Sequence, residues 1–198
     1  MAEILRLFVS ATNDLEAERA VIGRAVADLP VEIRMEIRRT PAAGAKYDDI
    51  YELIANVDRV YFLMGADITA PAGAEWHLAW QLERAVYPLK DGSPLSPAGR
   101  EFMRSAPVQW QRFRHSGELA RLVTLDLVRI LQHPTNRYGL TVTELELLAL
   151  HAKQIQRRQP DTAAGHVADE PGGAEGGGII LDRGRREPLD GVALDEES

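Results

Sequence analysis

Five short apolar runs alternate with amphipathic segments along residues 1–132, and this alternation restricts the possible folds more than any other feature. The runs cover residues 4–10, 31–37, 59–65, 86–89 and 108–113. The first and third are almost continuously apolar, which is typical of strands buried on both faces. Alternating strands and helices predict a parallel sheet with helices on both faces. The expected fold class is therefore α/β: a flavodoxin-like, doubly wound, five-stranded parallel sheet in a three-layer α/β/α sandwich.

The segments between these runs carry apolar residues at helical spacing, and several begin with residues that favour a helix start. Helices are predicted over residues 15–29, 47–57, 98–104 and 116–131, with a further helix beginning near Ala74. The expected start signals are capping boxes at Asn13–Glu16 and Thr141–Glu144, the pair Ser96–Pro97, and a cap at Ser116.

Two further segments follow the predicted α/β domain of residues 1–132. Residues 133–158 form a helical extension with an apolar stripe, which covers either the domain itself or a partner in a homo-oligomer. The stripe consists of Val142, Leu145, Leu148 and Ile155. Residues 159–198 are rich in glycine and acidic residues, so a disordered tail is expected there. The apolar run at residues 179–181 is either incidental or a short docking motif.

Charge and composition exclude several classes of protein. The net charge is −7, and the ten acidic and three basic residues of 159–198 account for all of it. A neutral body is not expected to bind nucleic acid in general. The chain has no cysteine, which excludes disulfides and cysteine-ligated metals. The apolar run near the start is too short for a membrane span, so we expect a cytoplasmic protein without a membrane partner.

The common cofactor motifs are absent from this sequence. No glycine-rich dinucleotide fingerprint follows the first strand, and neither a phosphate-binding P-loop nor a Gly-x-Ser-x-Gly nucleophile motif occurs. The five histidines are scattered without the spacing of metal ligands. The sequence therefore predicts neither a bound cofactor nor a metal.

Ligands of doubly wound sheets bind at the carboxyl ends of the strands, near the switch in strand order. The candidate ligand-binding residues at these ends are Ser10, Thr12, Asn13, Asp14, Glu36 and Gly65. Those after the first strand lie at a helix start, where hydroxyls and free amides can hold an anion or a ribose. Simple helix capping is the alternative role for them.

Glu75 is the strongest catalytic candidate. It falls in the first turn of the third predicted helix, where the helix dipole favours an ionised carboxylate. Such a carboxylate could attack or stabilise the cation that develops when an N-glycosidic bond breaks. The alternative is the ordinary preference for acidic residues at helix N-termini. Asp67, in the preceding loop, is a weaker candidate for an accessory acid. The nearby Trp76 and Trp80 are expected to pack rather than to stack on a base.

The segment Phe8 to Arg19, the segment Ala55 to Gly65, and the pair Glu75–Trp76 resemble the family catalogued as domain of unknown function 4062. The resemblance spans roughly residues 4–132. It implies a relative of the Toll/interleukin-1-receptor (TIR) and nucleoside deoxyribosyltransferase folds, with Glu75 at the position of the transferase nucleophile. The resemblance further implies a module of bacterial signalling or conflict systems, with an NTPase or effector protein as partner. The chain departs from the family pattern at Ala11 and at residues 65–68.

Two functions remain open at this point. The first is an intracellular signalling module of TIR-like fold that binds a nucleotide-like ligand or a partner protein without catalysis. The second is an N-glycoside hydrolase or transferase acting on NAD or (deoxy)nucleotides through Glu75. Whether the chain is an enzyme is thus left undecided by its sequence.

Overall fold

The computed structural model describes residues 2–157, and the predicted acidic tail lies outside this range. The strands are β1 (Leu5–Ala11), β2 (Met35–Arg38), β3 (Arg59–Met64), β4 (Val86–Lys90) and β5 (Gln111–Arg112). The helices are η1 (Asn13–Leu15, a 3-10 turn), α1 (Glu16–Ala27), α2 (Tyr47–Ala55), α3 (Ala72–Gln81), α4 (Pro97–Ser105), α5 (Ser116–Leu131) and α6 (Val142–Arg157).

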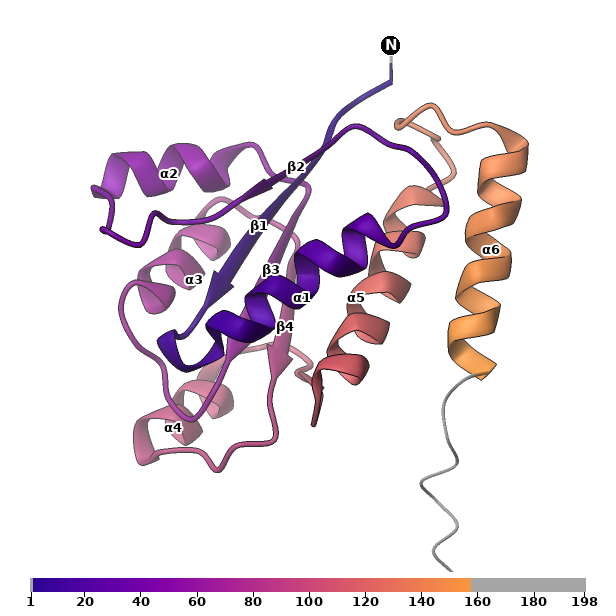
Figure 1. Cartoon of the computed structure of the whole chain (residues 1–198). Coiled ribbons are helices and arrows are strands. Elements are labelled where there is room, and N and C mark those ends of the chain that lie inside the picture. Colours follow the sequence, from indigo (N-terminus) through magenta and orange to yellow (C-terminus); the bar gives the residue numbers. More distant parts are fainter. Residues whose placement is uncertain (1, 158–198) are drawn as a thin grey trace, which may run out of the picture. The chain divides into compact units, whose positions relative to one another are not determined.

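All strand pairs are parallel, and the sheet has the order β2-β1-β3-β4-β5 (Figure 1). This is the strand order of flavodoxin-like doubly wound folds, so the predicted fold class is confirmed. β1 and β3 lie at the centre because their side chains are apolar on both faces, and six of the seven β1 residues are buried. Within residues 2–157, no helix is long and apolar enough to cross a membrane.

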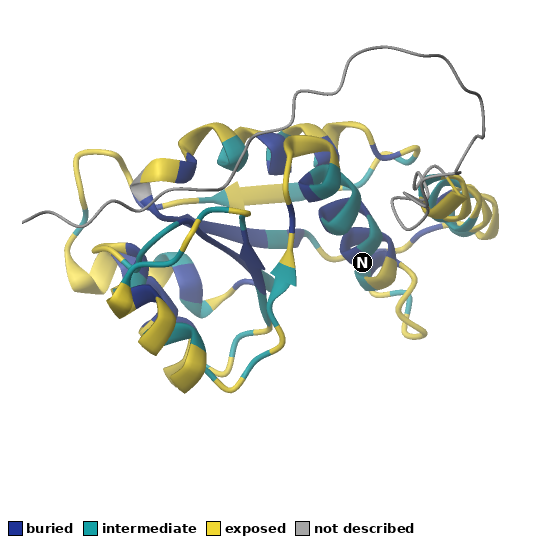
Figure 2. Ribbon diagram, turned by 90° about the horizontal axis from the view of Figure 1, so that it is seen from below, coloured by how far each residue is buried: buried dark blue, intermediate teal, exposed yellow. Residues whose placement is uncertain are grey.

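Helices cover both faces of the sheet. Helices α1 and α5 pack against one face, where Leu7, Tyr61 and Leu127 belong to the largest core cluster. Helices α2, α3 and α4 cover the other face through two smaller clusters, which include Phe8 and Phe62. Figure 2 shows buried residues along the strands and on the inward sides of these helices, with exposed residues on the outward sides. The burial pattern is therefore that of a three-layer sandwich.

Two predicted strands are shorter than expected. The run at residues 31–37 enters the sheet only at Met35, because its one partner, β1, begins at Leu5 directly opposite. The fifth strand is limited to Gln111 and Arg112, which pair with the last two residues of β4. Both are edge strands, which pair with a neighbouring strand on one side only.

Two of the predicted helix starts are confirmed, and two are wrong. The Ser96 hydroxyl accepts a hydrogen bond from Gly99 N at 2.9 Å, and the Thr141–Glu144 capping box is present, so both predictions are confirmed. Two further predictions are wrong. The N-cap position of α1 belongs to Leu15 rather than to Asn13, since residues 13–15 form a separate 3-10 turn. The long helix is capped by the His115 ring rather than by Ser116.

A buried ion pair ties α5 to the amino end of β3. Arg59 Nε lies 2.9 Å from Asp126 Oδ2, and the Tyr61 hydroxyl donates a hydrogen bond to the same oxygen. Burial raises the pKa of Asp126, and the Arg59 guanidinium opposes this rise. The charge of Asp126 is thus matched by a basic partner, as expected for a structural role.

The helical extension packs on α5. Leu148 is fully buried in the core, and Leu145 and Ile155 are half-buried, whereas Val142 is exposed. Most of the predicted stripe therefore covers the domain. On the opposite side of α6, Leu150 is 55% exposed.

The two leucines of α6 allow a matched test of this packing. Leu148→Ala is expected to lower the free energy of unfolding by about 2–5 kcal/mol, because it leaves a cavity in the core. Leu150→Ala is expected to change it by less than about 0.5 kcal/mol. Urea denaturation followed by circular dichroism measures both values. Equal effects of the two variants would show that α6 does not pack as described.

Candidate functional site

The strand order reverses between β1 and β3, and the predicted polar residues gather at this switch point. The chain passes from β1 to β2 on one side, whereas β3 leads to β4 on the other. Ser10 is the penultimate residue of β1, and Gly65 directly follows β3. Because the strands are parallel, both residues lie at the carboxyl edge of the sheet, which is where ligands of this fold class bind.

Glu75 lies in the same place. Its side chain projects from the first turn of α3 and is 3% exposed. The Ser10 hydroxyl donates a hydrogen bond to Oε2, and the Thr40 hydroxyl donates one to Oε1. The three side chains come from α3, from β1 and from the loop between β2 and α2. The structure thus brings Glu75 and Ser10 together.

The carboxylate of Glu75 has only neutral hydrogen-bond partners. Both of its oxygens accept from hydroxyl groups, as an ionised carboxylate can. No lysine, arginine or histidine of residues 2–157 forms an ion pair with it. The dipole of α3 favours a negative charge in this first turn. Glu75 is therefore a buried acid without a basic side-chain partner among residues 2–157.

Thr40 is a site residue that the sequence analysis did not identify. It is buried, whereas its neighbours Arg39 and Pro41 are exposed. A threonine in a loop gives no pattern in the sequence, because helical or strand periodicity does not extend into loops. The one signal that the sequence offered for Thr40 was its position shortly after a predicted strand.

Two hydrogen bonds join the turns that follow β1 and β3. Gly65 N donates to the Thr12 hydroxyl at 3.0 Å, and Ala66 N donates to Asp14 Oδ2 at 3.1 Å. A Cβ atom at position 65 would overlap the Asp14 carboxylate, so glycine is required for this close approach. The backbone amides of Gly65 and Ala66 are thus both hydrogen-bonded to side chains. Asp14 also adds a second carboxylate to this edge of the sheet.

The other predicted residues lie apart from Glu75 or make local contacts. Asn13 is the first residue of η1. Asp67 accepts a hydrogen bond from the next amide, Ile68 N, at 2.8 Å. Glu36 lies within β2 rather than after it, opposite Arg6 and four residues short of Ser10 along the strand direction. That offset is about 13 Å.

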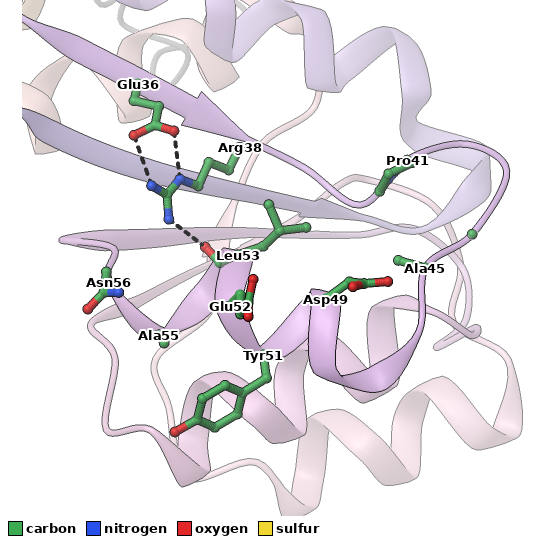
Figure 3. Close-up of a pocket in the computed structure, with 11 residues that line it drawn as sticks. Glu36, Arg38, Pro41, Ala45, Asp49, Tyr51, Glu52, Leu53, Ala55 and Asn56 are labelled. Carbon is green, nitrogen blue, oxygen red and sulfur yellow. Dashed lines mark hydrogen bonds and ion pairs between the residues drawn. The ribbon is translucent and has the colours of Figure 1, made fainter.

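Glu36 instead lines an open depression between the edge strand β2 and helix α2. Figure 3 shows its carboxylate paired with Arg38, at 2.9 Å between Nε and Oε1, while Arg38 also reaches the Leu53 carbonyl. The hydrogen bond from Arg38 lowers the pKa of Glu36. The depression measures about 860 Å3 and also contains Asp49 and Glu52, so its lining is acidic.

Trp76 packs as predicted and does not face an open site. It is buried and stacks on Trp110 with ring centroids 5.6 Å apart. Phe62 and Phe102 complete this cluster between the sheet, α3 and α4. Trp80 is 41% exposed beside it. No group of three or more metal-ligating side chains is found among residues 2–157.

Gly65→Ala tests the link between the two turns. The new methyl group is expected to displace the Asp14 carboxylate and to cost about 0.5–1.5 kcal/mol of stability, through loss of the exposed hydrogen bond to Ala66 N. Gly23→Ala is the control, since nothing lies within 4 Å of its Cβ position in α1. There alanine should stabilise the protein by about 0.5–1 kcal/mol.

Thermal unfolding of the single and double variants measures this coupling. In an Asp14→Ala background, Gly65→Ala should lose most of its effect, because the overlapping carboxylate is gone. An undiminished effect in that background would disprove the contact between Asp14 and Gly65.

Comparison with protein-family models, curated proteins and solved structures finds no significant match to this chain. The resemblance to domain of unknown function 4062 and to TIR-like domains therefore stays a prediction.

Proposed function

We propose that this protein binds a ribose-bearing, nucleotide-like small molecule at the switch point between β1 and β3, with Glu75 as its main polar anchor. One observation carries the proposal: a buried carboxylate at the carboxyl edge of a doubly wound sheet is held by two hydroxyl groups and by no cationic side chain of residues 2–157. Acidic side chains at this edge accept hydrogen bonds from ribose hydroxyls in the nucleotide-binding members of this fold class.

The two hydroxyls that now contact Glu75 are chemically equivalent to those of a sugar. A ribose hydroxyl that replaced the Thr40 hydroxyl would keep the hydrogen bond to Oε1, so the carboxylate would not be left unpaired. Thr40 is well suited to such an exchange, since it is the one buried residue of the loop 39–46. Ser10 lies in β1 and would stay in place as the second donor.

Binding measured by isothermal titration calorimetry tests the proposal. Adenosine, ADP-ribose and NAD form the panel. Glu75→Gln is expected to weaken binding at least about tenfold, because an amide presents only one acceptor oxygen. Thr40→Val should strengthen binding by up to about tenfold, since the competing hydroxyl is removed. Glu146→Gln is the control: this residue lies on the exposed face of α6, so its substitution should leave the affinity unchanged.

Two outcomes would contradict the proposal. One is the absence of binding by every member of the panel to the folded protein. The other is binding that is equally strong in the wild type and in Glu75→Gln, since the ligand would then lie elsewhere.

Cleavage of an N-glycosidic bond is the second candidate function. It is favoured by the uncompensated charge of Glu75 together with the Asp14 carboxylate at the same edge. Two carboxylates would stabilise the positive charge that develops on the sugar as the base leaves. Asp67 lies in the adjacent loop, where it could act as an accessory acid once a ligand rearranges its local hydrogen bond.

Release of free base distinguishes the two functions. If the protein is a hydrolase, chromatography after incubation with NAD or nucleosides should show free nicotinamide or purine, and Glu75→Gln should reduce the rate by about a hundredfold or more. Binding without base release supports the non-catalytic module. Base release that Glu75→Gln does not reduce would exclude Glu75 as the catalytic residue.

The signalling or conflict-system role, the cytoplasmic location and the NTPase or effector partner come from the sequence and from the family resemblance alone. We keep them as part of the proposal. A ligand-binding module with a docked C-terminal helix is compatible with such a role.

A further inference from the structure

A second polar depression lies along the same edge of the sheet, where α4 begins and β5 ends. Its volume is about 510 Å3. Its lining residues are Leu95, Pro97, Arg100, Glu101, Met103, Arg104 and Arg112. Three guanidinium groups face one carboxylate there, which leaves two positive charges uncompensated. The depression beside α2 has the opposite sign, with three carboxylates and one arginine.

The individual contacts show which charges are free. Arg104 pairs with Glu101 on the same helix. Arg100 donates to the Leu95 carbonyl at 2.7 Å, which holds the guanidinium in place without neutralising it. Arg112 is exposed and forms no ion pair with any residue in the range 2–157. The positive charges of Arg100 and Arg112 are therefore not compensated by an ion pair within residues 2–157.

The turn after β3 is in contact with the start of α4, which lines this depression. Ala66 N bonds to Asp14, and the Ala66 carbonyl accepts a hydrogen bond from Ser96 N at 2.9 Å, just before α4 begins. A Cβ atom at Gly99, in the first turn of α4, would lie within 2.7 Å of the same carbonyl, so helix and turn are in close contact. Ala66 thus contacts both Asp14 and the start of α4.

Arg112 also faces the same side of the sheet as Ser10. Side chains alternate along a strand, so Arg112 shares a face with Trp110, which stacks on Trp76 of α3. Ser10 reaches Glu75 on that same helix. Three strand spacings separate β1 from β5, a distance of about 14 Å. A nucleoside diphosphate, together with the length of the Arg112 side chain, can span such a distance.

We propose that Arg100 and Arg112 form a phosphate-binding subsite for the ligand whose ribose binds at Glu75. Guanidinium groups match phosphate oxygens in geometry and charge. At the switch point itself, Asp14 occupies the amide of Ala66 and repels an anion, so phosphate groups are directed along the edge toward α4. The subsite rests on its own arginines, whereas its link to a ribose rests on the proposed function.

Inorganic phosphate tests the subsite without any nucleoside. Phosphate should raise the melting temperature of the wild type above that measured in sodium chloride at equal ionic strength. Arg112→Gln should weaken the apparent phosphate affinity about tenfold. Arg24→Gln is the matched control, because it removes the same charge from an exposed arginine of α1, on the opposite face of the sheet. It should respond like the wild type.

Two results of this titration would overturn the subsite. The first is no stabilisation beyond that given by chloride. The second is an equal loss of affinity in Arg112→Gln and Arg24→Gln, which would mean that phosphate binding depends only on the net charge of the protein.

A comparison of adenosine with ADP tests the link to the ribose site. ADP should bind the wild type about tenfold or more tightly than adenosine, and Arg112→Gln should abolish that difference. Equal affinities for adenosine and ADP would refute the link. If neither binds but inorganic phosphate still stabilises the protein through Arg112, the proposed ribose site fails and the phosphate subsite stands.

Discussion

Parallel hydrogen bonding between β1 and β3 places Leu7 opposite Arg59 and Ala11 opposite Leu63, and the other elements take their positions from this pair. Both strands are apolar on both faces, so each needs a helix layer on either side. β2 and β4 then add to the outer edges of the pair. Because the chain leaves β1 and β3 in opposite directions, the two turns at their carboxyl ends meet at the switch point.

Two buried carboxylates in this fold have different environments. Asp126 has a guanidinium partner and a tyrosine hydroxyl, so its charge is compensated within the core. Within the described part of the chain, the side-chain partners of Glu75 are two hydroxyl groups, and it lies at the edge where ligands of this fold class bind. A buried charge without a basic partner is costly unless it is hydrogen-bonded. Such an arrangement suits a group that exchanges its partners for those of a ligand.

The carboxyl edge of the sheet carries charges of opposite sign in two regions. Glu75 and Asp14 make the switch point negative, whereas Arg100 and Arg112 make the region near α4 positive. A ligand that carries a sugar at one end and an anion at the other would match this division. The sequence does not reveal this separation of charges, because the acidic and basic residues before residue 159 are equal in number and their charges sum to zero.

The sequence by itself determined the sheet class, the order of elements and the position of Glu75 in a first helical turn, because these follow from periodicity and from local capping preferences. It did not determine the partner of Glu75 from the loop after β2. Thr40 reaches that carboxylate from 35 residues away in the chain, and no local pattern encodes such a contact. The same holds for Asp14, which bonds across to Ala66 in the turn after β3. Only the tertiary structure could decide these contacts, since parallel strand pairing alone brings together turns that are distant in sequence.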